Sequence, residues 1–408
     1  MSLDVNISEP DDFNCVELHS VIEDIAKTHD MDEFIYHVDS VCGRGEHYVA
    51  NLFRVYVFDE KQKDNCVQVI VKTLLNSTRE TLFHRLHERE VLVYDEVLPE
   101  FQEIQKNIND VNERLLIMKR YYPREELHKE VILLEDMLER GFVMRDKTKA
   151  MDYEHADLVV RNLAKLHAFS YVLKIREPVK FETFKDRFSD IVFSEDFLNE
   201  SNFKDYFSES FSTSVKVVTD VSAKLKLEEL ASTVIDRMNE FVKATDYSVL
   251  CHGDCWTNNM LFKYQEETPK DVCLLDYQAM RYSSPVTDIL YFMYLCTDSS
   301  FRMKYSERLQ RSYYRCLKDV LKNYDVEAEL VYPEDSFQKD LSDYALFGFL
   351  VAMTEIKIVT LSVDEEKFLT NSDLLDSGRQ APDALSSYID RVNDVVQEFK
   401  NKGHLESL

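Results

Sequence analysis

The chain has 408 residues, of which 45% are hydrophobic and 12% aromatic, and this length favours two domains or lobes with substantial cores. Its 76 acidic and 49 basic residues give a formal net charge of −27. So acidic a chain lacks the basic footprint of nucleic-acid-binding proteins and is repelled by anionic membranes.

Cysteine usage and the N-terminal sequence favour a cytoplasmic location. The eight cysteines are scattered, and Met1 to Phe13 is acidic and polar, unlike a secretion signal. The longest apolar runs, such as Ile289 to Cys296, are too short to span a bilayer. We expect a disordered tail at residues 1–14 and no obligate protein partner.

Residues 15–135 are predicted to form a small lobe with an antiparallel sheet. Helical spacing of apolar residues covers Val16 to Tyr36, and a loop with Gly43 and Gly45 follows. Two strand-like runs with hairpin spacing come next, Val49 to Phe58 and Cys66 to Leu75.

The next segment, Arg79 to Val97, predicts an amphipathic helix. Glu90 lies on its apolar face, where a carboxylate needs a partner. Lys72 ends the second strand, and alternation puts it on the same face as Gln68 and Ile70. Lysines at strand ends are usually solvated, but a Lys72–Glu90 ion pair would satisfy both groups, as it does in kinases.

Weaker patterns cover the residues between this helix and the predicted boundary between the lobes. Pro99 is expected to close the helix, Asn107 to Tyr122 is a candidate strand region, and Glu130 to Leu134 predicts a strand. The pattern changes at Glu135-Asp136-Met137, so residues 136–408 are predicted to form a larger, mostly helical lobe. Its main helical patterns are Tyr153 to Leu173, Phe181 to about Ala244, and Ile289 to Cys296.

The central segment of the chain is Leu250 to Met260. It holds Asp254 and Asn259, and Asp276 follows at the end of a second apolar strand. These residues alone could build a polar turn and a cap, but their combined spacing is that of a phosphotransferase catalytic centre. Asp254 can accept the proton of a hydroxyl, whereas Asn259 and Asp276 can hold Mg²⁺ on ATP.

The loop with Gly43 and Gly45 gives weaker support for a nucleotide-binding site. A Gly-x-Gly is usually a turn, but the chain has only seven glycines, and Gly43, Gly45 and Gly253 all fall at the predicted site. Backbone amides of a loop before the two strands could cover the phosphates of a nucleotide.

Other polar residues near the centre receive structural interpretations. The spacing of Cys251, His252, Cys255 and Cys273 does not match a zinc knuckle, so a zinc site is not expected. His252 is expected to brace the loop by hydrogen bonds, and His167 to be a core histidine. Asp288 could anchor the central loop from beneath or cap the next helix, and the cap is the preferred interpretation.

Together these motifs resemble the ecdysteroid kinase-like family, also called CHK kinase-like proteins, which belongs with the choline kinase and aminoglycoside phosphotransferase group. The resemblance covers roughly residues 35 to 365. The segments that carry it are His252 to Asn259, Leu275 to Gln278, Ser284 to Tyr291, Leu134 to Met137, Gly141-Phe142 and Leu163 to Ala168.

The resemblance implies a bilobal α+β fold of the protein-kinase-like type, with ATP in the cleft and transfer of its γ-phosphoryl group to a small-molecule hydroxyl. By position, Asp254 would be the catalytic base, Asn259 and Asp276 the metal ligands, and Lys72 the partner of Glu90 and of the phosphates. The four residues Leu134, Glu135, Asp136 and Met137 would form the hinge facing adenine. Tyr277 departs mildly from the phenylalanine that is commoner there.

Ecdysteroids are the namesake substrates of the family, and other hydroxylated compounds are also proposed for its members. Two alternatives remain open at this point. One is a kinase for choline-like or aminoglycoside-like substrates, which the acidic charge allows. The other is a scaffold that binds ATP without turnover, against which the intact set of Lys72, Glu90, Asp254, Asn259 and Asp276 argues.

Overall fold

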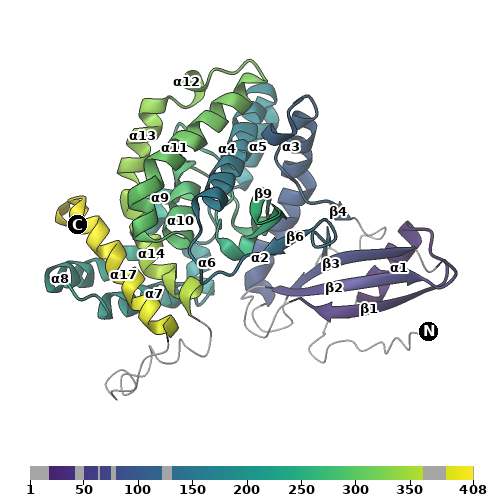
Figure 1. Ribbon diagram of the computed structural model, residues 1–408, viewed down its shortest axis with the longest axis horizontal. Helices are drawn as coiled ribbons and strands as arrows, with labels where there is room; N and C mark the ends of the chain where they lie inside the picture. Colours follow the sequence, from purple (N-terminus) through teal and green to yellow (C-terminus); the bar gives the residue numbers. More distant parts are fainter. Residues whose placement is uncertain are drawn as a thin grey trace.

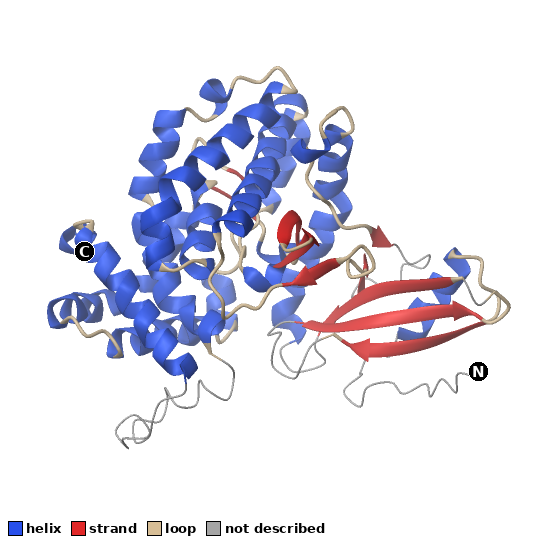
Figure 2. Cartoon of the chain, in the orientation of Figure 1, coloured by secondary structure: helices blue, strands red, loops and turns tan. Residues whose placement is uncertain are grey.

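The structure is a computed structural model that describes residues 18–41, 50–62, 65–74, 80–121, 131–361 and 383–407. A smaller lobe built around a sheet lies beside a larger, mostly helical lobe (Figures 1 and 2), which is the bilobal α+β fold predicted above. The predicted tail at residues 1–14 and the glycines Gly43 and Gly45 lie outside the described residues. The exact lobe boundary, between residues 135 and 136, stays a prediction.

The smaller lobe contains an antiparallel sheet with strand order β1-β2-β3-β5-β4. The strands are β1 (Phe34–Ser40), β2 (Ala50–Asp59), β3 (Cys66–Leu74), β4 (Arg120–Tyr121) and β5 (Val131–Glu135). Helix α1 (Leu18–Thr28) covers one face, where Val69 and Val71 of β3 are buried against it. Because side chains alternate along a strand, Ile70 and Lys72 lie on the opposite face, as predicted.

Two predictions for this lobe are wrong. The helix expected over Val16 to Tyr36 ends at Thr28, because Asp30 adopts a left-handed backbone with φ 58° and the chain then enters β1. The strand region expected over Asn107 to Tyr122 contains a 3₁₀ turn at Val111–Glu113, and only Arg120–Tyr121 joins the sheet. In the first place, pairing with β2 outweighs the local apolar pattern; in the second, an apolar pattern without a partner strand does not form a strand.

Helix α2 (Glu80–Leu92) runs between the two lobes (Figure 1). It continues through a π-helical turn (Val93–Val97) into helix α3 (Leu98–Gln105). Pro99 therefore does not end the helical segment; it lies in the first turn of α3, directly after the π-helical turn.

The larger lobe is organised around α4, most of which is buried, with α11 packed along it and α10 packed against α14. Its described α-helices are α4 (Tyr153–Arg176), α5 (Pro178–Arg187), α6 (Glu195–Glu200), α7 (Phe203–Lys216), α8 (Val221–Leu230), α9 (Val234–Val242), α10 (Val286–Cys296), α11 (Ser299–Lys322), α12 (Ala328–Val331), α13 (Glu334–Asp343), α14 (Ala345–Thr360) and α17 (Asp383–Asn401). The long helical pattern from Phe181 to Ala244 is thus divided among several helices. None of the described helices combines the length and apolar character needed to cross a membrane.

Two small sheets in this lobe support the central segment. Strand β7 (Val249–Cys251) pairs with β10 (Arg281–Ser283). Strands β6 (Phe142–Met144), β8 (Met260–Gln265) and β9 (Thr268–Leu274) form the other sheet. The loops that follow β7 and β9 therefore each begin at the end of a strand that is paired in a sheet.

Candidate active site

The central loop is the part of the central segment that joins β7 to β8. Its Asp254 accepts a hydrogen bond at each carboxylate oxygen. The hydroxyl of Tyr291, on α10, donates a hydrogen bond to Oδ1 at 2.7 Å. The amide nitrogen of Asn259 donates to Oδ2 at 2.9 Å. Asp254 therefore has a defined orientation although it lies on a loop.

The surroundings of Asp254 raise its pKa. Burial is the largest cause, and the negative charge of Asp276 adds to it. The hydrogen bonds from Tyr291 and Asn259 act in the opposite direction but do not outweigh these effects. A carboxylate with a raised pKa accepts a proton more readily than an ordinary aspartate, as a general base must.

Asn259 closes the loop through its amide nitrogen. Besides the carboxylate, this nitrogen donates to the backbone carbonyl of Asp254 at 2.8 Å. The side chain is thereby oriented with its oxygen away from Asp254, and none of the described residues donates a hydrogen bond to that oxygen. An amide oxygen in this position has the chemistry of a Mg²⁺ ligand.

Asp276 follows β9 in a left-handed backbone conformation, with φ 60° and ψ 69°. This conformation costs roughly 1–3 kcal/mol for a residue with a side chain, and it persists where neighbours enforce it. Here the Leu275 amide donates to the Asn259 carbonyl at 2.9 Å, and Nε2 of His252 donates to the Leu275 carbonyl, also at 2.9 Å. His252 thus braces the loop, as predicted.

Lys72 joins the smaller lobe to this loop. Its Nζ lies 2.5 Å from the Glu90 carboxylate, so the predicted ion pair is present, and 3.0 Å from Oδ1 of Asp276. Burial alone would lower the pKa of Lys72, but the carboxylates of Asp276 and Glu90 outweigh it, and the pKa is raised. Lys72 is therefore a positive charge between a carboxylate of the loop after β9 and a carboxylate of α2.

Asp288 anchors the central loop from beneath, and the interpretation of this residue as a helix cap is wrong. Its Oδ2 accepts a hydrogen bond from the His252 amide at 2.6 Å, and its Oδ1 accepts one from the Gly253 amide at 2.9 Å. Helix α10 begins after Pro285 without a side-chain cap. A local cap would use the carboxylate within its own helix, whereas here the partners are two buried amides of a distant segment.

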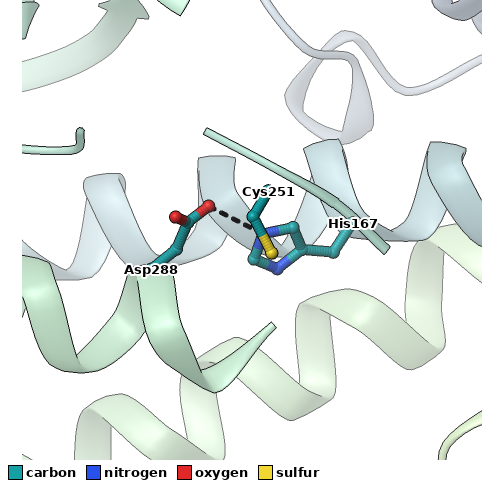
Figure 3. Close-up of side chains that lie close together, drawn as sticks. All are labelled: His167, Cys251 and Asp288. Carbon is teal, nitrogen blue, oxygen red and sulfur yellow. Dashed lines mark hydrogen bonds and ion pairs between the residues drawn. The ribbon is translucent and has the colours of Figure 1, made fainter. Parts of the chain in front are cut away.

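His167, Cys251 and Asp288 lie close together in the core, with possible ligand atoms within 4.8 Å of one another (Figure 3). Each group already has a partner within the protein. Nε2 of His167 is 3.1 Å from Asp288, its Nδ1 is 2.8 Å from the Tyr313 hydroxyl, and the Cys251 thiol donates to the Ser283 carbonyl at 3.3 Å. The cluster is therefore a hydrogen-bonded support, and His167 is the satisfied core histidine that the sequence predicted.

Gly253 allows the central loop to touch the segment after Asp276. Its φ is 87°, and a Cβ atom placed on it would lie 2.0 Å from the carbonyl oxygen of Ala279. Only glycine fits both the backbone conformation and the contact. The loop with Asp254 and the loop with Asp276 are therefore packed backbone against backbone.

The predicted hinge residues lie at the end of β5 and in the turn that follows. Leu134 and Met137 are buried apolar residues of the large core. The Asp136 carboxylate is buried and accepts hydrogen bonds from the side chains of Arg54 and Gln68, on β2 and β3. Its side chain therefore ties the turn to the sheet. The backbone of Glu135 donates to the Lys119 carbonyl at 2.9 Å.

Sequence reasoning missed three side chains: Tyr291, which donates to Asp254, and the hydrogen-bonded pair of Tyr206 and Glu355. Tyr291 was noticed only as part of a motif. Glu355 is a carboxylate within the largely apolar helix α14, and it accepts a hydrogen bond from the Tyr206 hydroxyl, on α7, at 3.1 Å. The argument that identified Glu90, that an acid on an apolar helix needs a partner, could have identified Glu355 as well.

Comparisons with known proteins give a family and several similar solved structures. Residues 44–326 match the ecdysteroid kinase-like family. A search of curated proteins finds no match.

Similar solved structures include the GDP complex of wild-type aminoglycoside 2'-phosphotransferase-IIIa, with 12% identity, coverage of 95% of this chain and 100% of that one, and a TM-score of 0.41. The GDP and kanamycin complex of APH(2")-IIIa has 12% identity, coverage of 95% and 99%, and a TM-score of 0.39. An aminoglycoside-3'-phosphotransferase of type VIII has 14% identity, coverage of 80% and 99%, and a TM-score of 0.31.

Proposed function

Because the chain belongs to the ecdysteroid kinase-like family, we propose that it is an ATP- and Mg²⁺-dependent kinase that phosphorylates a hydroxyl of a small molecule. The observation that carries this proposal is the contact of Lys72 with both Glu90 and Asp276. It joins a strand and a helix of the smaller lobe to the loop after β9 in the larger lobe, which packs against the loop that holds Asp254. A purely structural lysine has no need of two carboxylates from separate lobes, of which Glu90 is buried and Asp276 partly exposed.

The residues at the site fit a Mg²⁺–nucleotide complex. Asp276 and Asn259 offer a carboxylate and an amide oxygen, the ligand types that Mg²⁺ prefers. When bound, the ion would neutralise negative charge on the phosphates. Lys72, held by Glu90, would contact the phosphates directly, and the turn from Leu134 to Met137 would face the adenine base.

The proposed reaction uses Asp254 on the acceptor. The carboxylate orients the acceptor hydroxyl and takes its proton as the oxygen forms a bond to the γ-phosphorus. The bond between that phosphorus and the leaving oxygen breaks, and ADP departs with the electron pair. Most of the rate enhancement would come from positioning and from charge stabilisation, because phosphoryl transfer needs little covalent chemistry from the protein.

The family supports an ecdysteroid or another hydroxylated small molecule as the acceptor. The six described cysteines are free thiols, which supports a reducing, cytoplasmic setting. Neither part of the proposal involves nucleic acid or a membrane surface.

The test compares wild-type protein with Asp254→Asn and Asp276→Asn, using labelled ATP and a panel of steroids, phenols, glycosides and choline. Each substitution should reduce product formation by about 10²–10⁴-fold while circular dichroism stays unchanged. Asp236→Asn, at an exposed position on α9, is the matched control and should retain full activity. Retained turnover in either site variant contradicts its role, and Mg²⁺-dependent ATP binding by the wild type without any product favours a non-catalytic scaffold.

A further inference from the structure

Glu355 is a buried acid near the candidate active site that the proposed reaction does not use. Its side chain belongs to α14, and the residue is only 7% exposed. Its Oε2 accepts the hydrogen bond from Tyr206 on α7. Within the described part of the chain, no donor is bound to its Oε1, so the carboxyl group keeps capacity for one more partner.

The packing of α14 on α10 brings the helix of Glu355 against the helix that carries Tyr291, the donor to Asp254. The helices approach closely at Gly348, where a Cβ atom would lie 2.6 Å from the ring of Tyr294. Glu355 lies about two helical turns further along the same side of α14. On α10, Tyr291 donates to Asp254, and burial, followed by the negative charges of Asp254 and Glu355, raises the pKa of this tyrosine.

Helix packing gives the placement of Glu355. Helix α14 packs on both α10, whose Tyr291 donates to Asp254, and α7, whose Tyr206 donates to Glu355. Burial, with a further contribution from the charge of Asp254, raises the pKa of Glu355. An acceptor whose hydroxyl reaches Asp254 from the side of these helices would pass Glu355.

We propose that Glu355, held by Tyr206, binds a second hydroxyl group of a neutral, polyhydroxylated acceptor while the first hydroxyl is presented to Asp254. This inference rests on the proposed kinase function and names the class of its acceptor.

Two observations favour a neutral acceptor group over a cationic one. Burial, with a further contribution from Asp254, raises the pKa of Glu355 to about 7, so much of the carboxyl is uncharged at neutral pH. An uncharged carboxyl both donates and accepts hydrogen bonds, which matches a hydroxyl. The ammonium group of Lys357 also lies over the Tyr206 ring at 4.4 Å, and this positive charge disfavours a second cation beside it.

Binding can be tested without turnover, because Trp256 is the single tryptophan and adjoins Asp254. Its fluorescence would report titrations with three probes on one ring: trans-1,2-cyclohexanediol, cyclohexanol and trans-2-aminocyclohexanol. Wild-type protein should bind the diol about tenfold more tightly than cyclohexanol, the value of one good hydrogen bond, and no more weakly than the amine.

Glu355→Gln keeps a donor and an acceptor without charge, so it should retain the preference for the diol within about threefold. Glu355→Leu should abolish the preference, and Tyr206→Phe should reduce it. Glu209→Gln, at an exposed position on the same helix as Tyr206, is the matched control. Circular dichroism and thermal melting verify that each variant is folded.

Several results would overturn the inference. These are equal affinity of the wild type for diol and cyclohexanol, no binding of any probe, or an undiminished preference for the diol in folded Glu355→Leu. Tighter binding of the amine that is lost in Glu355→Gln would instead assign a cationic acceptor. Diol binding without phosphorylation of any acceptor would count against the proposed kinase function alone, whereas phosphorylation without diol preference would count against this inference alone.

Discussion

Replacement of Asp288 by alanine should both destabilise the protein and inactivate the candidate site. The carboxylate is 0% exposed and receives hydrogen bonds from the His252 and Gly253 amides and from His167. Burial would raise its pKa, but the hydrogen bond and charge of His167 and the amide of Gly253 outweigh burial and lower the pKa. Asp288 is therefore an anion held by three buried donors.

The expected loss in the free energy of unfolding follows from the three donors that alanine leaves without an acceptor. Each unsatisfied buried donor costs about 1–3 kcal/mol. The three together should lower the free energy of unfolding by about 4 kcal/mol, near the lower end of their sum, because water can enter the space left by the carboxylate. Asp288→Asn keeps one oxygen of nearly the same shape, so its cost should be about half as large.

The assay is urea denaturation followed by circular dichroism, with product formation measured in parallel on the folded proteins. Activity of Asp288→Ala should fall by at least about tenfold, because the amides that carry Asp254 lose their anchor. Asp298→Ala, which removes the N-cap of α11, is the control: it should cost about 1 kcal/mol and leave activity intact. If Asp288→Ala loses no more stability than this control, the anchoring argument is wrong.

Three further predictions concern single side chains. Lys72→Met should reduce phosphoryl transfer by at least about 100-fold and lower the free energy of unfolding by about 2–4 kcal/mol, because Glu90 stays buried without its cation; normal activity and stability would refute the assigned pairing. Tyr291→Phe removes a hydrogen bond to ionised Asp254, so the acidic limb of the kcat/KM profile should move up by about one pH unit, and an unmoved limb would show that the bond is unimportant. The folded-state pKa of Glu355, about 7, lies above its ordinary value of 4.5. The wild type should therefore lose about 3 kcal/mol of stability relative to Glu355→Gln as pH rises from 4.5 to above 7. Urea denaturation at both ends of this window measures the difference, and an unchanged difference would refute the reasoning.

Patterns with a strong period predicted the fold well. Strand β3 lies at Cys66–Leu74 and α4 begins at Tyr153, close to the predicted limits, because alternation and helical spacing there agree with the tertiary packing. The errors arose where a local pattern was weak or ambiguous. The apolar residues after Asp30 fitted a helix as well as a strand, and only pairing with β2 decides between them.

The candidate site was predictable where one residue implied a partner. Glu90 on an apolar face required a cation, and the ion pair with Lys72 is present. Asp288 was misassigned because helix caps are local and common, whereas its actual partners belong to a loop far away in sequence. Glu355 escaped notice because its partner, Tyr206, belongs to a helix separated from it by 149 residues of sequence.

The contact between Gly253 and Ala279 also bears on how such a protein could acquire new acceptors. The two loops that hold Asp254 and Asp276 pack backbone against backbone there and are joined by the hydrogen bond from the Leu275 amide to the Asn259 carbonyl. Among the described residues, the side chains of α7 and α14 take no part in these backbone contacts. A library that randomises these helical walls and leaves the two packed loops unchanged would therefore vary acceptor choice without altering the geometry of phosphoryl transfer.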